Sequence, residues 1–247
     1  MQKILVGVYR IVIGLTLMFI TGSIALLLKW ITFGRSTNFG RKYLVAPTSK
    51  FILRLIGVRF QLPDVKEYPA KQLMYTFNHN SYLDILIVTA MAVPNSRFFL
   101  SENTWKYLPL TISAMAIGVC YIPVKSDAKR RLKFFKRMEA ELRKGKHSIF
   151  VSSEGVHLFQ HGIAPFNNGV YHLATNCHLP IQPVYLHIPK ETNSLEGFDF
   201  KSGKIEVYLL KEVSTLSWKL EDLEENKNAV REIFLKEYEK RNELTKE

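Results

Sequence analysis

The feature that most constrains the fold of this chain is an uninterrupted apolar run near its N-terminus. Residues 11–28 read IVIGLTLMFITGSIALLL, carry no charge, and are bounded by Arg10 and Lys29. A run of this length is at the lower limit for a helix that crosses the hydrocarbon of a bilayer. Trp30 and Phe33 follow it, where an aromatic belt would lie at a membrane interface. The run therefore predicts a helix that holds the chain at a membrane.

A secretory signal peptide is the competing interpretation of this run. No small-x-small cleavage site follows it, and the chain continues with WITFGRSTNFGRK, so an anchor is favoured. More cations follow the run than precede it, so a full span would place the remaining chain on the cytoplasmic side. A half-inserted amphipathic or re-entrant helix fits the length equally well. In either case we expect a membrane location, specifically the cytoplasmic face of a bacterial inner membrane.

Beyond the apolar run, short β-rich runs alternate with helical patterns. The β-rich runs lie at residues 58–62, 73–77, 97–100, 119–124, 148–151, 181–188 and 204–210. The helical patterns lie at residues 43–55, 82–92, 105–116, 128–144, 169–176 and 220–241. This alternation predicts an α/β fold with a mixed sheet covered by helices, preceded by an N-terminal membrane-associated helical motif. We assign residues 1–52 to those helices and residues 53–247 to one α/β domain, which a chain of this length and apolar content can form.

The chain is strongly basic, and part of the excess charge is concentrated in one predicted helix. The formal net charge is +12, which indicates an anionic partner: nucleic acid, a membrane surface, or an acidic substrate carrier. Residues 125–146 hold ten Lys or Arg against three acids. A solvated helix face is the ordinary explanation of such a cluster. The functional alternative is a surface that docks anionic lipid headgroups or an acidic carrier, through Lys129, Arg130 and Lys133.

The apolar side of this helix argues against nucleic acid as the partner. We expect Leu132, Phe135, Met138 and Leu142 to form its buried stripe. The nearby aromatic residues would then lie on or beside that stripe, which leaves no exposed platform on which bases could stack.

The first group of candidate catalytic residues lies in residues 75–86, YTFNHNSYLDIL, which read as a strand, a polar turn and a helix. His79 lies in the turn, at a strand end where α/β proteins place reactive groups. Asp84 falls in the first helical turn and could hold the imidazole in one tautomer while it accepts a proton. The spacing of Ser81 and Asp84 also fits a capping box with no tie to His79, and spacing alone favours that alternative. A base without its own nucleophile would act on a substrate hydroxyl or amine.

The second group lies in residues 150–169, FVSSEGVHLFQHGIAPFNNG. Glu154 and Gly155 come directly after a predicted strand, where Glu154 could hold a substrate or order the loop and Gly155 could let a ligand approach the backbone. His157 and His161 have the spacing of two metal ligands on a helix, but the surrounding glycines and proline argue against a helix. No third ligand is evident, so we expect no metal site.

Several common chemistries lack their sequence motifs. The chain has no G-x-S-x-G nucleophile elbow, no G-x-x-x-x-G-K-[ST] loop and no G-x-G-x-x-G turn. Its two cysteines, Cys120 and Cys177, are far apart and suggest neither a disulfide framework nor a zinc site.

At these residues the chain resembles the glycerolipid acyltransferase family of the 1-acylglycerol-3-phosphate acyltransferase (PlsC) type. The family's first block, Asn-His followed after four residues by Asp, matches Asn78, His79 and Asp84. Its Phe-Pro-Glu-Gly-Thr-Arg block matches SSEGVH at residues 152–157. The remaining matches are Ser101-Glu102, Trp105, Pro109, the stretch from Gly118 to Lys125, Pro165-Phe166, Gly169, and Pro180-Ile181-Gln182-Pro183-Val184. Together these ordered blocks span about residues 55–210, and they favour the catalytic interpretation of His79 and Asp84.

The resemblance implies a fatty acyl transfer from acyl-CoA or acyl-ACP to the hydroxyl of a lyso-lipid, as in phospholipid biosynthesis. His79 would be the general base and Asp84 its orienting partner. The acceptor site would include Glu154, Gly155, His157 and Lys125. The resemblance implies no metal and no bound cofactor, and the expected partners are the donor, the acceptor and a membrane surface, with no nucleic acid.

The departures from the family pattern concern positively charged positions. The family arginine after Glu-Gly-Thr is His157, the arginine that closes the second block is Lys125, and the lysine before Glu102 is Ser101. Neither Lys nor His reproduces the planar fork with which arginine binds a phosphate. An acceptor without a phosphomonoester, such as a lyso-aminolipid, is therefore an alternative. An inactive membrane-bound docking protein and a basic surface-binding protein remain open as other classes.

Overall fold

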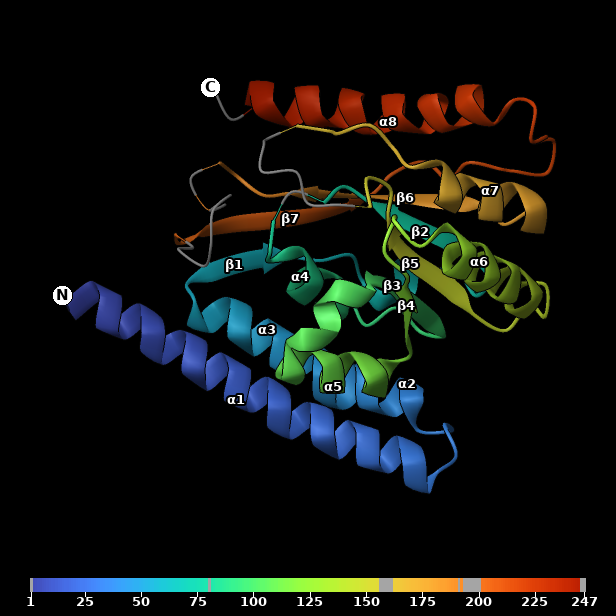
Figure 1. Cartoon of the computed structure of the whole chain (residues 1–247). Helices are drawn as coiled ribbons and strands as arrows, with labels where there is room; N and C mark the ends of the chain where they lie inside the picture. Colours follow the sequence, from blue (N-terminus) through green and yellow to red (C-terminus); the bar gives the residue numbers. More distant parts are fainter. Residues whose placement is uncertain (1, 80, 156–161, 191, 193–200, 245–247) are drawn as a thin grey trace.

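The computed structural model describes residues 2–79, 81–155, 162–190, 192 and 201–244, and it is built around a seven-stranded mixed sheet (Figure 1). The strands lie in the order β1-β7-β6-β2-β5-β3-β4. Their bounds are β1 (Val58–Gln61), β2 (Met74–Phe77), β3 (Ser96–Ser101), β4 (Val119–Ile122), β5 (Ser148–Ser152), β6 (Ile181–His187) and β7 (Gly203–Leu209). Each of the seven β-rich runs forms a strand, so the predicted α/β fold with a mixed sheet is confirmed.

The strand directions determine which chain segments meet at one edge of the sheet. Strands β6, β2, β5, β3 and β4 run parallel to one another, whereas β7 runs antiparallel to β6, and β1 runs parallel to β7. In the centre of the sheet, Phe77 of β2 pairs with Ser152 of β5 on one side and with Val184 of β6 on the other. His79 and Glu154 each come two residues after these paired positions. The register therefore brings the two segments to the same edge.

Helices cover both faces of the sheet (Figure 1). One face carries α1 (Gln2–Ile31), α2 (Thr37–Phe39), the π-helix η1 (Gly40–Val45), α3 (Ala46–Leu55), α4 (Asp84–Ala90) and α5 (Leu108–Ile117). The other face carries α6 (Ala128–Leu142), α7 (Asn168–Cys177) and α8 (Leu223–Leu244). Two short 3-10 helices, η2 (Val65–Glu67) and η3 (Glu102–Lys106), lie in loops.

The central strands supply side chains to a core on each side. Tyr75 and Phe150 belong to the core beneath α3, α4 and α5, whereas their neighbours Met74 and Ile149 belong to the core beneath α6, α7 and α8. Successive strand residues point to opposite faces, and because both faces are covered, these strands are buried along their whole length and mostly apolar.

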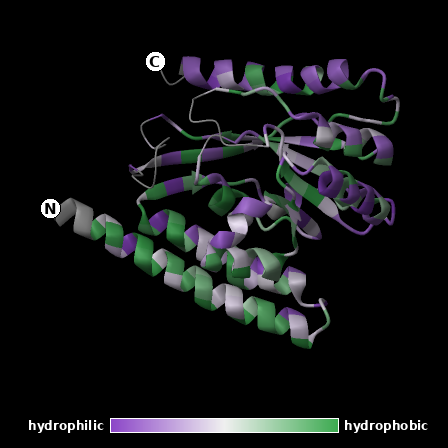
Figure 2. Ribbon diagram, in the orientation of Figure 1, coloured by the Kyte–Doolittle hydropathy of each residue, from purple (hydrophilic) through white to green (hydrophobic). Residues whose placement is uncertain are grey.

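The N-terminal apolar run forms the long helix α1, as predicted. Its stretch Val6–Ile31 is long and apolar enough to cross a membrane, judged by length and composition alone. Figure 2 shows hydrophobic residues along most of its length. The helix lies lengthwise beside α5 and α3 (Figure 1). At the contact with α5, a Cβ added to Gly22 would lie 2.9 Å from the Ser113 backbone nitrogen, and the Ser113 hydroxyl donates to the Met18 carbonyl oxygen at 2.9 Å.

A buried arginine ties these N-terminal helices to the sheet. Arg41 of η1 donates through Nη2 to the carbonyl oxygens of Ser96, at the start of β3, and Ile117, at the end of α5, at 2.5 and 2.6 Å. Its Nη1 donates to the Asn38 side chain at 2.6 Å. The N-terminal helices therefore have a fixed position relative to the strands. The expected domain division after residue 52 stays a prediction.

Two details of the predicted helices are wrong. The helix expected at residues 105–116 is divided into η3 and α5, because Pro109 at the start of α5 favours a new helix there. On α6, Leu132 is 59% exposed, and Phe134 takes its place in the core beside Met138 and Leu142. The reason is helical geometry: Phe134 lies one turn before Met138, whereas Leu132 lies about 120° around the helix from it.

Candidate active site

The predicted contact between His79 and Asp84 forms at the end of β2. The Nδ1 atom of His79 lies 2.7 Å from the Oδ2 atom of Asp84, the first residue of α4. The Asp84 side chain is 1% exposed, while the His79 side chain is 30% exposed. The imidazole thus faces solvent on one side and a buried carboxylate on the other. With Nδ1 donating to Asp84, the nitrogen that would accept a proton is Nε2.

The same carboxylate oxygen also explains the capping pattern. Asp84 Oδ2 accepts the backbone N–H of Ser81 at 3.2 Å. The Ser81 hydroxyl accepts the N–H of Leu83 at 3.1 Å, so the aspartate half of a capping box is formed without its usual serine half. The two alternatives left open by the spacing are therefore compatible, because one oxygen both holds the turn and contacts His79.

The charges around His79 favour its protonated form. Burial lowers the pKa of His79, but the hydrogen bond and negative charge of Asp84, with the negative charge of Glu154, raise that pKa above its usual 6.5. A raised pKa makes the imidazole a stronger base for the removal of a proton from a hydroxyl.

Glu154 follows β5 and is a buried residue, 2% exposed. Burial raises the pKa of Glu154 to about 7, against hydrogen bonds from the backbone N–H groups of His79 and Ala164 that lower it. The glutamate therefore contacts the backbone that carries the base. Spacing in the sequence could not reveal this contact, because β2 and β5 are neighbours only in the folded sheet.

Gly155 and Lys125 are linked through Asn167, a residue that lies outside the predicted site. Gly155 has φ +67°, in the left-handed region that favours glycine. Asn167 Nδ2 donates to the carbonyl oxygen of Glu154, and Lys125 Nζ donates to Asn167 Oδ1 at 3.3 Å. The position of Asn167 directly before α7 was the available signal, since Asn is common at helix starts. His157 lies outside the described residues, as does His161.

The predicted docking cations differ in their surroundings. Lys129 and Lys133 are exposed on α6. Arg130 instead forms an ion pair with Glu102, with 2.7 Å between Nη2 and Oε2. Glu102 also accepts the backbone N–H of Val124 at 3.0 Å. Arg130 therefore helps to join the segments that follow β3 and β4.

The fold and the site together define an α/β domain that carries a histidine–aspartate pair and a buried glutamate at the carboxyl ends of its central strands. A family model described as Acyltransferase matches residues 59–187. Because this match covers more than half of the 247 residues, the chain belongs to the acyltransferase family, and within it to the glycerolipid (PlsC) type.

Individual relatives agree with this assignment. The chain is 24% identical over 163 residues to the 1-acyl-sn-glycerol-3-phosphate acyltransferase of Saccharomyces cerevisiae, covering 65% of this chain and 54% of that protein. It is 24% identical over 186 residues to the alpha form of this enzyme from Bos taurus, covering 73% of this chain and 63% of that protein. The chain thus spans about half to two thirds of the length of these relatives.

A solved structure shares the fold over nearly the whole chain. The crystal structure of the 1-acyl-sn-glycerophosphate acyltransferase PlsC from Thermotoga maritima matches with a TM-score of 0.78 and 17% sequence identity. The match covers 98% of both chains, so the shared fold includes the N-terminal helices.

Proposed function

We propose that this protein transfers a fatty acyl group from a thioester donor, acyl-CoA or acyl-ACP, to the hydroxyl of a lyso-lipid acceptor. The observation that carries the proposal is the 2.7 Å contact between His79 Nδ1 and Asp84 Oδ2 at the open end of β2. A base held in this way removes a proton from a bound hydroxyl without forming a covalent acyl-enzyme.

The reaction follows from the position of the base. His79 Nε2 takes the proton of the acceptor hydroxyl while the hydroxyl oxygen attacks the thioester carbonyl carbon. The tetrahedral intermediate collapses, the carbon–sulfur bond breaks, and the leaving thiolate takes the proton from the imidazolium. An ester bond replaces the thioester bond, and the histidine returns to its neutral form. The carboxylate of Asp84 stabilises the imidazolium between these two proton transfers.

In the same proposal, Glu154 supports His79 through the backbone of the turn that carries it. Its carboxylate accepts the backbone N–H of His79 and contributes negative charge beside the imidazole. Because its side chain is buried, Glu154 does not contact the acceptor. It acts on the acceptor site through the turn that Glu154 and Gly155 form. In this proposal Lys125, joined to that turn through Asn167, meets the acceptor headgroup; its support is the contact of Lys125 with Asn167 and of Asn167 with Glu154.

For the acceptor, 1-acylglycerol-3-phosphate is the leading candidate, because the relatives carry that substrate in their names. A phosphate-free lyso-lipid, such as a lyso-aminolipid, is the competing candidate. Its support is the replacement of two family arginines by Lys125 and His157, which lack the bidentate geometry that arginine offers a phosphate.

We further propose that α1 lies half-inserted in one leaflet and does not cross the membrane. Along its length it packs on α5 and α3, so a spanning α1 would carry these helices into the bilayer with it. Helix α3 contains Lys50 and Arg54, whose charges are costly in hydrocarbon. The outer side of α1 is apolar instead, with exposed Val12, Leu15 and Phe19. The proposed location is the cytoplasmic face of a bacterial inner membrane, where anionic headgroups would attract this basic chain.

Mass spectrometry of the products tests the proposed reaction. The purified protein is given one acyl donor and a mixture of lysophosphatidate and a lyso-aminolipid in micelles, and the new diacyl lipids are identified. We expect transfer to at least one acceptor and a loss of at least about a hundredfold in His79→Ala, because a general base contributes about this much. Wild-type turnover in His79→Ala, or no acyl lipid from any acceptor, contradicts the proposal. A preference for lysophosphatidate above about a hundredfold that His157→Arg does not increase would exclude the phosphate-free alternative.

A further inference from the structure

The outer side of α6 carries a row of positive charge. Lys129, Lys133 and Lys136 are exposed and lie on one side of the helix, around the exposed side chain of Leu132. We call these four residues the basic ridge. None of its lysines forms an ion pair with another residue of the chain that the structure describes. Elsewhere on the helix and just beyond it, Arg130, Arg143 and Lys144 are paired with Glu102, Glu139 and Glu141.

The basic ridge begins at the edge of the sheet that holds the active site. Helix α6 follows β4, which runs parallel to β2 and β5, so its first turn lies at their carboxyl ends. Lys125, one turn's length before Lys129 in the chain, contacts Asn167, and Asn167 contacts Glu154. A partner seated on the basic ridge would therefore lie beside the entrance to the site.

The basic ridge also lies on the side of the sheet away from the membrane-associated helix. Figure 1 shows α1, α3 and α5 on one face and α6, α7 and α8 on the other. A bilayer that holds α1 is separated from α6 by the sheet. The basic ridge therefore faces the aqueous side, which favours a soluble anionic partner over lipid headgroups.

We propose that the basic ridge docks the acyl carrier protein form of the donor, an acidic protein that presents its acyl group as a thioester on a flexible arm. This inference rests on the proposed acyl transfer and specifies its donor. The three lysines extend over about 10 Å of helix, which is longer than one phosphate group and suits a row of carboxylates on a protein surface. Leu132 supplies an apolar contact at the centre of a charged rim, an arrangement typical of protein interfaces. The arm of the carrier then reaches from the docking surface to His79.

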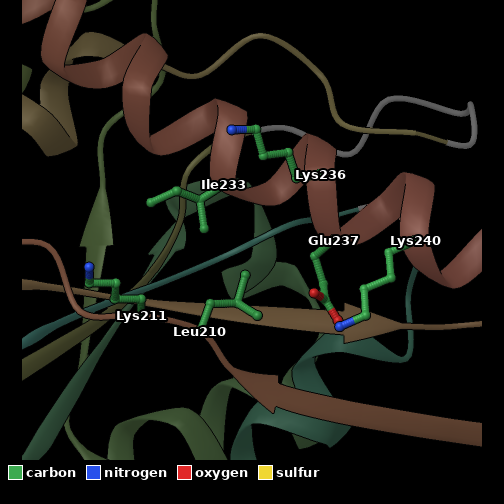
Figure 3. A pocket seen from close by; sticks show the side chains of 6 residues that line it. All are labelled: Leu210, Lys211, Ile233, Lys236, Glu237 and Lys240. Atoms are coloured by element: carbon green, nitrogen blue, oxygen red, sulfur yellow. The ribbon is translucent and has the colours of Figure 1, made fainter.

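Binding measurements separate docking from catalysis. Acylated carrier protein is labelled and titrated with His79→Ala protein in detergent at low and moderate salt, so that no thioester is consumed. The test variant reverses the three lysines of the basic ridge to glutamate. The control makes the same charge change on the three lysines that line a shallow depression between the end of β7 and α8 (Figure 3). The control positions are Lys211, Lys236 and Lys240.

We expect the basic ridge variant to weaken carrier binding at least tenfold at low salt, and the control to weaken it less than twofold. Alanine at the three ridge positions should give an intermediate loss, and circular dichroism melting should confirm that all variants fold. Equal losses in ridge and control variants, or no carrier binding by the parent protein, overturn the proposal. So does a ridge variant that keeps carrier binding but loses binding to vesicles with one quarter phosphatidylglycerol. Ridge-dependent binding together with a wild-type protein that forms no acyl lipid supports the docking surface while refuting the proposed reaction.

Discussion

Asp84→Asn is the most informative single change, because it removes a charge while keeping the size of the side chain. In the structure one carboxylate oxygen accepts from both His79 and the backbone of Ser81. An amide oxygen can still accept one of these hydrogen bonds, but the amide nitrogen donates. If this amide nitrogen faces His79, it donates to Nδ1, so the proton of the imidazole lies on Nε2. Nε2 can then no longer accept a proton from the acceptor hydroxyl. The same change in a histidine-dependent triad lowers kcat about 10⁴-fold. We therefore expect a loss of roughly 10³–10⁴, equivalent to about 4–5.5 kcal/mol of transition-state stabilisation.

The change should also alter the dependence of stability on pH. The pKa of His79 is raised in the folded protein, so the His79–Asp84 pair contributes stability that is fully present below pH 6.5 and is lost as pH rises through the folded value. Losing hydrogen bonds to a buried carboxylate costs about 1–3 kcal/mol in the free energy of unfolding. We therefore expect Asp84→Asn to lose more free energy of unfolding at pH 6 than at pH 9. The acid limb of kcat/KM, set by neutral His79, should lie above pH 6.5 in the wild type and move lower in the variant.

The assay follows labelled acyl transfer in mixed micelles from pH 5.5 to 9, with urea unfolding at both ends of this range. Ser81→Ala is the matched control, since it removes the hydroxyl that accepts from Leu83 but leaves the backbone bond to Asp84. It should lower stability by about 1 kcal/mol or less and leave the rate nearly unchanged. If Asp84→Asn loses no more than tenfold in rate and behaves like this control, Asp84 only caps the turn and does not orient His79.

Two further changes test the surroundings of the site. In Gly22→Ala, the new Cβ would lie 2.9 Å from the Ser113 nitrogen, so α1 must move away from α5. We expect the free energy of unfolding in urea to fall by about 1–3 kcal/mol. An unchanged unfolding midpoint would contradict the close contact. In Glu154→Gln, a buried group with pKa about 7 can no longer ionise. Because ionisation in the fold costs stability as pH rises from 4.5 through 7, the variant should gain on the order of 1 kcal/mol relative to wild type at pH 8 while losing activity; equal melting shifts at pH 5 and pH 8 would argue against a buried carboxylate.

The sequence predicts those parts of this fold whose causes are local. The strands β2 and β5 are mostly apolar runs, as burial on both faces favours, and their predicted bounds agree with the observed ones to within one residue. Spacing alone leaves a capping box as the alternative to a His79–Asp84 contact, and only the family resemblance favours the contact; the contact forms because a turn and one helical step separate the two residues. The contact of Glu154 with the His79 turn was not predictable from spacing, since it depends on β5 lying beside β2. The pairing of β1 with β7 is likewise a long-range outcome, as these strands are separated by most of the chain.

The packing of α1 on α5 has a consequence for how the protein is made. The ribosome completes α1 before it has synthesised α5, and roughly 75 residues lie between them. At about 5–20 residues per second, that interval lasts about 4–15 s. During this time the side of α1 that ends up against Ser113 has no protein partner from its own chain. The nascent helix therefore meets a bilayer or a chaperone first, and the α/β domain is assembled onto a helix that is already in place.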